Sequence, residues 1–119
     1  MSNYFENAAK LIGNLGAEPE VKATQNGEMV IMSVGTTTPG YRDQESGEKK
    51  GERTIWHRVV SFNPRVVNFA KHLKKGEKVA IEGFMDNRSF EKDGKTSYIH
   101  EIVADSLASL STKSSKAAA

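Results

Sequence analysis

Alternation of apolar and polar residues at a period of two is the pattern that most restricts how this chain can fold. In the run VIMSVGTTT, residues 30–38, it places Val30, Met32 and Val34 on one face. A period of two is that of a β-strand with one buried face, so each such run predicts a strand. The same alternation recurs in three further runs, residues 54–62, 78–85 and 95–104.

One segment follows a helical period instead. Asn63 is a good N-cap residue, and Pro64 suits the first helical position, where no N–H is needed. Apolar residues then follow at the spacing of one buried helix stripe, at Val66, Phe69, Ala70 and Leu73. Lys74 and Lys75 complement the negative end of a helix, and Gly76 suits the position after it. The sequence therefore predicts a helix that starts at Pro64 and ends near Gly76.

Glycines and charged residues mark the connections. The first apolar run, AAKLIGNLG, ends in glycines that predict a strand running into a bend. Asn26-Gly27 and Asp93-Gly94 are dipeptides typical of hairpin turns. Residues 39–53 contain three glycines and four charges of each sign, which predicts a projecting hairpin loop.

Three antiparallel strands, one helix and two more strands form the order of an OB fold, a small Greek-key barrel of five strands. The interpretation is an all-β OB fold with one α-helix between the third and fourth strands and with protruding β-hairpins. Another small five-stranded barrel has the same order. We expect one domain over residues 1–110 and a disordered tail over residues 111–119.

Composition limits the functional classes. With no Cys among 119 residues, the chain has no disulfide framework, thiol nucleophile or Cys-ligated zinc, which suits a reducing compartment. Its apolar runs fall short of the roughly 18 residues that cross a bilayer, and the first ten residues lack the features of a secretory signal. Residues 1–105 contain 15 Lys and Arg and 15 Asp and Glu, so net charge alone does not argue for nucleic acid.

Catalytic patterns are weak. His57, His72 and His100 lie on three different predicted elements and lack the spacing of a metal site. The glycines do not form a phosphate-binding loop, and the scattered acids are interpreted as solvated charges. We expect no enzyme activity, metal or cofactor.

The aromatic residues are more informative. Trp56 and Phe62 share a strand face with Arg58 between them, and their alternative role is core packing. Tyr41, next to Arg42, and Phe90 lie in polar hairpins where little core is available. Aromatic faces that stack on bases, with cations that meet phosphates, are typical of proteins that bind unpaired nucleic acid.

Four motifs support this hypothesis: LIGNLGAEPEV, TIWHRVVSF, LKKGEKVAIEGFM and NRSFEKDGK. In this order and with these gaps they closely resemble the bacterial-type single-stranded DNA-binding proteins, over residues 11–104. The resemblance implies an OB fold that binds single-stranded DNA with little sequence preference during replication, recombination and repair. It also implies a homotetramer, with a dimer as the alternative.

The resemblance assigns roles by position. Trp56 and Phe62 match stacking residues, Phe90 takes the place of a stacking Trp, and Tyr41, beside Arg42, stands where a loop Trp is common. The basic residues that match DNA contacts are Arg58, Arg88, Lys74 and Lys75. His57 resembles a residue at the subunit interface, and its alternative is a hydrogen-bonded strand histidine.

Departures from the family pattern are also visible. Asp86 and Ser89 flank Arg88 where the family often has more basic residues, and Ala9 and Lys10 replace aliphatic residues of a strand used in assembly. No acid follows Asp105, so either the sequence is truncated or this member lacks the acidic tip through which relatives recruit protein partners. Partners of such a tip are not expected.

Two rival functions stay open, a protein-interaction OB module such as a replisome adaptor and an RNA-binding barrel. The expected location is bacterial cytoplasm, associated with the nucleoid. An organelle matrix and a phage or plasmid origin are alternatives.

Overall fold

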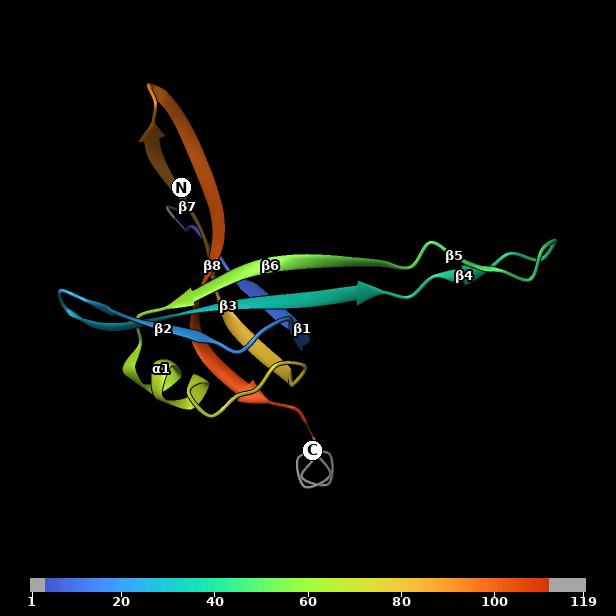
Figure 1. Cartoon of the computed structure of the whole chain (residues 1–119), viewed down its shortest axis with the longest axis horizontal. Coiled ribbons are helices and arrows are strands. Elements are labelled where there is room, and N and C mark those ends of the chain that lie inside the picture. Colours follow the sequence, from blue (N-terminus) through green and yellow to red (C-terminus); the bar gives the residue numbers. More distant parts are fainter. Residues whose placement is uncertain (1–3, 112–119) are drawn as a thin grey trace.

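The structure is a computed structural model, and it describes residues 4–111 (Figure 1). Its elements are β1 (Ala9–Leu15), β2 (Glu20–Thr24), β3 (Gly27–Thr38), β4 (Tyr41–Arg42), β5 (Lys49–Lys50), β6 (Arg53–Ser61), α1 (Pro64–Ala70), β7 (Lys78–Lys92) and β8 (Lys95–Ser109).

Five long strands close into a ring. β1 pairs with β7, β7 with β8, β8 with β6, β6 with β3, and β3 returns to β1. The β6–β8 pairing is parallel, whereas the other four are antiparallel. The predicted OB barrel with one helix between its third and fourth strands is confirmed. β2 is an additional strand, paired along the free side of β3.

The core fills the ring and continues under α1. Val30, Met32 and Val34 of β3 are buried, as their alternation predicts. They pack in one cluster with Val79 and Ile81 of β7 and with apolar residues of α1 and the segment after it. Burial of such side chains contributes about 1.5–3 kcal/mol each, so this cluster holds the barrel together.

The helix is shorter than predicted. The side chain of Asn63 accepts a hydrogen bond from the Arg65 N–H, which confirms the N-cap. The helix ends at Ala70, because the chain then turns so that Leu73 reaches the core from outside the helix. Val67 is buried, whereas Phe69 remains 39% exposed, so the predicted stripe is wrong at Phe69.

The shorter helix also corrects the prediction for its basic end. Lys74 and Lys75 lie beyond Ala70, and the last turn of α1 contains no basic residue. Gly76 has a left-handed φ of 87° but lies in the turn before β7. There its N–H donates to the carbonyl of Leu15. The lysines therefore belong to a loop, and complementing a helix dipole is not their role.

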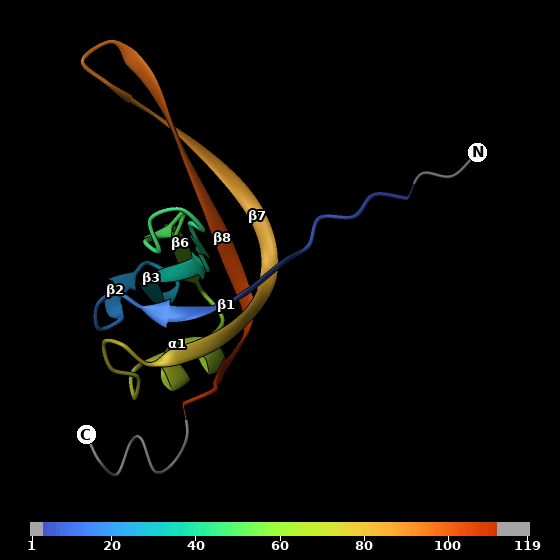
Figure 2. The same cartoon turned by 90° about the vertical axis from the view of Figure 1, so that its right-hand side faces the viewer.

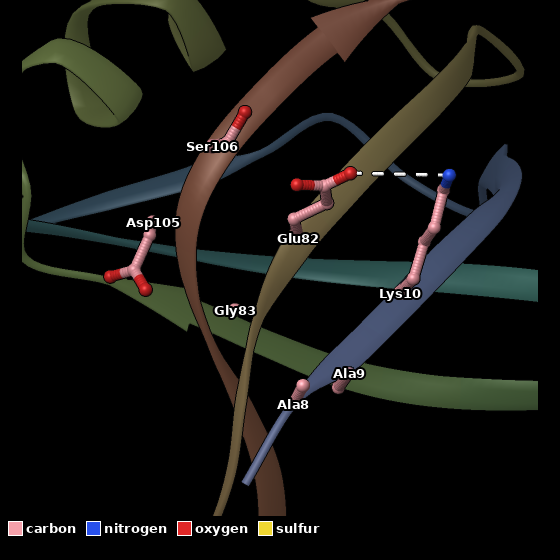
Figure 3. Close-up of a pocket in the computed structure, with 7 residues that line it drawn as sticks. All are labelled: Ala8, Ala9, Lys10, Glu82, Gly83, Asp105 and Ser106. Atoms are coloured by element: carbon pink, nitrogen blue, oxygen red, sulfur yellow. Dashed lines mark ion pairs between the residues drawn. The ribbon is translucent and has the colours of Figure 1, made fainter. Parts of the chain in front are cut away.

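A register shift between Glu82 and Gly83 interrupts the alternation of β7. Ile81 is buried before the shift, whereas Met85 after it is exposed, so the alternation of residues 78–85 does not give one continuous buried face. The shift lies beside a hollow between β1, β7 and β8, where Lys10 and Glu82 form an exposed ion pair at 4.0 Å (Figure 3).

Two hairpins project from the barrel in different directions (Figures 1 and 2). β3 and β6 continue into the small β4–β5 ladder, which confirms the predicted projecting loop. We call this hairpin, residues 36–55, the β4–β5 arm. The second is the outer part of β7 and β8, residues 86–101, which we call the β7–β8 arm. It turns at Asp93-Gly94, where φ values of 54° and 75° match the predicted hairpin turn.

Two smaller expectations are refined. The β2–β3 turn is centred on Gln25 and Asn26, one residue earlier than predicted, with Gly27 starting β3. At the other end, Ser111 accepts a hydrogen bond from the Lys78 N–H at 3.0 Å. The rest of the predicted tail, residues 112–119, lies outside the described residues.

Candidate nucleic-acid interface

Trp56 and Phe62 are surface residues. Trp56 is 58% exposed and Phe62 57% exposed, while Val60 between them is buried. The core-packing alternative is therefore wrong for both aromatic rings. Because side chains alternate along β6, Trp56 and Arg58 extend from the same side of this strand. Phe62 follows directly after the last residue of β6, Ser61.

Two glycines lie under the indole ring of Trp56. A Cβ atom at Gly16 would lie 2.6 Å from Trp56 Cζ3, and one at Gly35 would lie 2.7 Å from the same atom. Gly35 is the direct partner of Trp56 across the β3–β6 ladder. Neither glycine has a positive φ, so their missing side chains serve the close approach of the ring. With one face on the glycines and more than half of its surface exposed, the indole is a one-sided platform.

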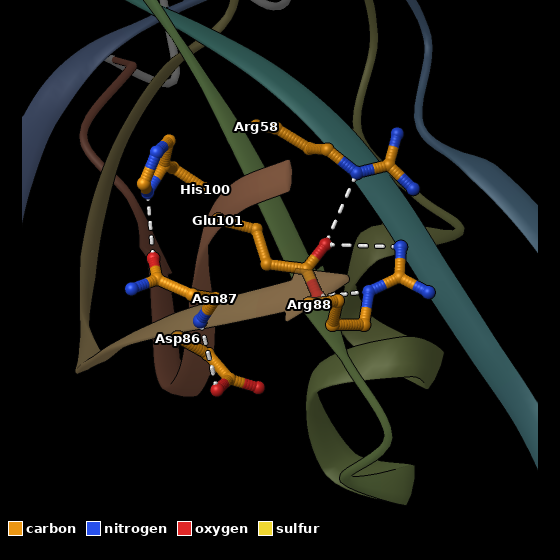
Figure 4. Close-up of polar contacts among 6 residues, drawn as sticks. All are labelled: Arg58, Asp86, Asn87, Arg88, His100 and Glu101. Atoms are coloured by element: carbon orange, nitrogen blue, oxygen red, sulfur yellow. Dashed lines mark hydrogen bonds and ion pairs between the residues drawn. The ribbon is translucent and has the colours of Figure 1, made fainter. Parts of the chain in front are cut away.

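Arg58 and Arg88 meet at one carboxylate (Figure 4). Arg58 Nε lies 3.1 Å from Glu101 Oε2, and Arg88 Nε lies 2.8 Å from Glu101 Oε1. Arg88 Nη2 adds a longer contact of 3.4 Å to Oε2. The three residues come from β6, β7 and β8, so the network joins the barrel strand that carries Trp56 to the β7–β8 arm.

Glu101 corrects the expectation that the acids are solvated. Its side chain is only 3% exposed, and it is the one buried charged residue among residues 4–111. A buried carboxylate is stable only when it is paired and hydrogen-bonded, and the two guanidinium groups meet that need.

Two hollows flank the central part of β6. Both are lined by Trp56, His57 and Arg58. The one toward the β7–β8 arm adds Met85, Asp86, Asn87, His100, Glu101 and Ile102. The other includes Glu18, whose carboxylate pairs with Lys74 at 3.9 Å. Lys74 itself does not line this hollow, but it forms an ion pair with Glu18, which does. Lys75 is exposed in the same loop.

The β7–β8 arm has two chemically different faces. Directly paired residues of an antiparallel ladder share a face, and the pairs alternate between faces. Arg88 pairs with Ile99 and Phe90 with Ser97, so Arg88 and Phe90 lie on the face that continues to Glu101. Tyr98 pairs with Ser89 on the opposite face. There His100 Nδ1 also lies 2.6 Å from Asn87 Oδ1. Phe90 is partly exposed and available for a flat ligand.

The β4–β5 arm presents Tyr41 to solvent. Arg42 Nη1 donates to the Gly47 carbonyl at 2.8 Å, so Arg42 helps to close its own loop. The Glu45 N–H and the Lys50 ammonium group both donate to Asp43, which lowers the pKa of Asp43 below its ordinary value. Lys49 lowers the pKa of Glu52 in the same way. Because the two arms leave the barrel in different directions, Tyr41 and Phe90 lie on separate projections (Figure 1).

His57 is hydrogen-bonded within the barrel. Its Nε2 atom lies 2.9 Å from Thr36 Oγ1 on the neighbouring strand β3. The structure therefore supports the reading of a hydrogen-bonded strand histidine. It does not test the role at a subunit interface.

Within residues 4–111 no three His, Cys, Asp or Glu side chains gather as a metal site. The hollow beside Lys10 and Glu82 adds Asp105 and Ser106, but no histidine lines it (Figure 3). The same part of the chain contains no helix that is long and apolar enough to cross a membrane.

Sequence reasoning missed Glu101, Gly16 and Gly35. On its predicted strand face Glu101 lies between Ile99 and Val103, and an acid between two apolar residues of one face is a signal for a buried ion pair. Gly35 interrupts a strand, where glycine often marks a close approach by another group. The sequence alone could not show that Trp56 lies against the glycines, or that Arg58 and Arg88 pair with Glu101.

Comparison with known proteins agrees with this geometry. The model of the "Single-strand binding protein family" matches residues 6–110. The chain is 36% identical over 108 residues to single-stranded DNA-binding protein 1 of Xylella fastidiosa (strain 9a5c), covering 90% of this chain and 79% of that protein.

Two solved structures are also similar. The Plasmodium falciparum SSB in complex with ssDNA superposes with a TM-score of 0.77 at 30% identity, covering 93% of this chain and 100% of that one. A deletion mutant of the single-stranded DNA binding protein from Thermus aquaticus superposes with a TM-score of 0.73 at 26% identity, covering 91% of this chain and 52% of that one. A match of the family model over most of the chain and this level of identity to a relative show that the chain belongs to the single-strand binding protein family.

Proposed function

We propose that the chain binds single-stranded DNA by stacking bases on Trp56, Phe62 and Phe90 while Arg58 and Arg88 contact phosphates. The observation that carries this proposal is the exposed Trp56 platform beside an arginine pair, on the barrel of a single-strand binding protein. Only unpaired bases offer their faces for stacking, so this surface favours single strands over duplex.

Stacking contributes on the order of 1–3 kcal/mol per base and is tolerant of sequence, because every base has a flat face. Arginines contribute a second attraction, which weakens with salt because bound phosphates release counterions. The two contributions explain how a nearly neutral domain holds DNA. The proposal includes no chemical step, and its biological setting is replication, recombination and repair, in the compartment that contains the DNA.

Tyr41, Lys74 and Lys75 complete the proposed contact set, and Arg42 supports it from the loop next to Tyr41. Tyr41 extends the proposed DNA-binding surface onto the β4–β5 arm, where its side chain is exposed. Lys74 forms an ion pair with Glu18, which lines the hollow beside Trp56. Arg42 is engaged in its own loop, so we assign it the role of shaping that loop beside Tyr41.

The test is a binding measurement by fluorescence anisotropy with a labelled dT oligomer. Unlabelled dT should compete, whereas duplex of the same length should compete much more weakly. Equal competition by duplex would contradict the stacking mechanism. Stronger competition by oligo-U would identify an RNA-binding barrel, and no binding of either oligomer would favour a protein-interaction module.

We also propose that copies of the chain assemble, as a tetramer or, alternatively, as a dimer. Ile12 of β1 and Phe84 of β7 are exposed apolar residues on paired strands, which suits contact with another copy. Lys10 on the same strand reduces the apolar character of that surface. Light scattering with and without dT oligomers tests the proposal, and a monomer under both conditions would contradict it.

A further inference from the structure

Glu101 occupies the place where the β7–β8 arm leaves the barrel. The ladder between β6 and β8 contains two residue pairs, Val59 with Ile102 and Val60 with Val103. The next residues outward are Arg58 and Glu101, which are joined through their side chains at 3.1 Å. This ion pair continues the connection between the two strands at the base of the arm.

Glu101 binds only some of the side-chain nitrogen atoms of Arg58 and Arg88, so the other nitrogen atoms can bind a phosphate. Arg58 uses Nε alone, and Arg88 uses Nε and Nη2. Among residues 4–111 this leaves both Nη atoms of Arg58 and Nη1 of Arg88 without a hydrogen-bond partner. The side chains of Arg58 and Arg88 are 39% and 52% exposed, whereas the side chain of Glu101 is only 3% exposed. A phosphate can therefore approach the arginines while they stay bound to Glu101.

Two guanidinium groups held this close repel each other unless an anion lies between them. Without Glu101, each long side chain has many solvated conformations, and fixing both on a phosphate costs side-chain entropy. With Glu101, the orientations of both arginines are already fixed before DNA binds.

We propose that Glu101 is a positioning residue that holds Arg58 and Arg88 as one two-arginine phosphate site and fixes the β7–β8 arm against β6. This inference rests on the proposed function, since it concerns how the same surface holds DNA. The proposal predicts a change in DNA affinity opposite to the one expected from charge alone. Removing a negative charge next to DNA normally strengthens binding, but here the loss of Glu101 weakens it.

Two variants separate positioning from charge. Glu101→Asp keeps the charge but shortens the side chain, and Glu101→Gln removes the charge at nearly constant size. Both should weaken binding of a dT oligomer, by roughly tenfold if about one charge-assisted hydrogen bond to DNA is lost. The matched control is Asp105→Asn, an exposed acid on the same strand, which should leave the affinity unchanged or slightly raise it.

The two variants would overturn the proposal if they fold and bind dT as well as the unmodified protein or better, since Glu101 would then merely compete with phosphate. A failure of the unmodified protein to bind dT would contradict the proposed function instead, so the two failures are distinguishable.

A second measurement needs no variant. In the unmodified protein, the Nε–H signals of Arg58 and Arg88 in nuclear magnetic resonance spectra should be protected from exchange both before and after dT is added. Loss of that protection on binding would show that phosphate displaces Glu101, which would overturn the positioning role.

Discussion

Substitution of Gly35 by Ala tests whether the position of the indole ring matters for binding. The new Cβ would lie 2.7 Å from Trp56 Cζ3, about 0.7 Å short of the 3.4 Å at which ordinary contact begins. The backbone φ of Gly35 is not positive, so alanine is tolerated there, and the end of a side chain is what must move. The ring should therefore shift outward by several tenths of an ångström while the barrel stays folded.

The magnitude follows from the stacking energy. A gap of 0.5–1 Å forfeits about a quarter to a half of a van der Waals attraction. Applied to roughly 1–3 kcal/mol per stacked base, this gives a loss of about 0.3–1.5 kcal/mol, or roughly 2- to 12-fold in affinity. Complete removal of the ring in Trp56→Ala should cost about 5- to 150-fold. The free energy of unfolding of Gly35→Ala should change by less than about 1 kcal/mol.

The assay combines dT binding by anisotropy with thermal unfolding. The double variant Gly35→Ala, Trp56→Ala is the essential comparison, because the glycine should have no effect once the ring is gone. If Gly35→Ala weakens binding by the same factor in both backgrounds, the glycine does not act through Trp56 and the reasoning is refuted. Gly16→Ala should behave in the same way, since its Cβ would lie 2.6 Å from the same ring atom.

Three further predictions concern other parts of the surface and the fold. Phe90→Ala should weaken dT binding by about 1–3 kcal/mol, whereas Tyr98→Ala, on the opposite face of the same arm, should have little effect in the same anisotropy assay. Asn63→Ala removes the N-cap of α1, so denaturant unfolding should show a loss of about 0.5–2 kcal/mol with dT affinity unchanged. Because the pKa of Asp43 is lowered, its loop contacts should still be present at pH 3.8, the ordinary value, and be lost only as the pH falls through the lowered pKa. The amide signal of Glu45 would report this loss, and a change near neutral pH would contradict it.

The sequence predicted the architecture because alternation and turn residues are local signals. The buried positions of β3 and the Asp93-Gly94 turn lie where their patterns place them. The helix end could not be placed in the same way. Leu73 continues the apolar spacing of the helix, yet the chain leaves the helix after Ala70 and brings Leu73 into the core by a turn. A spacing pattern cannot distinguish these two ways of burying one side chain.

The site was only partly visible in the sequence. The exposure of Trp56 and Phe62 could be predicted because the sequence also places aromatic residues and basic residues in polar hairpins. Alternation alone did not exclude core packing. The burial of Glu101 could not, because it depends on Arg58 and Arg88 arriving from two other strands. The glycines under Trp56 were missed for the same reason, since Gly16 and the ring meet only in the closed barrel.

The central claim is that a base stacks on Trp56, and the intrinsic fluorescence of the protein tests it most directly. Trp56 is the single Trp among 119 residues, so the tryptophan signal comes from this one ring. Titration with a dT oligomer should quench the emission and reach saturation in parallel with binding measured by anisotropy. If the oligomer binds while the emission of Trp56 stays unchanged, the ring is not a stacking platform and the account is wrong.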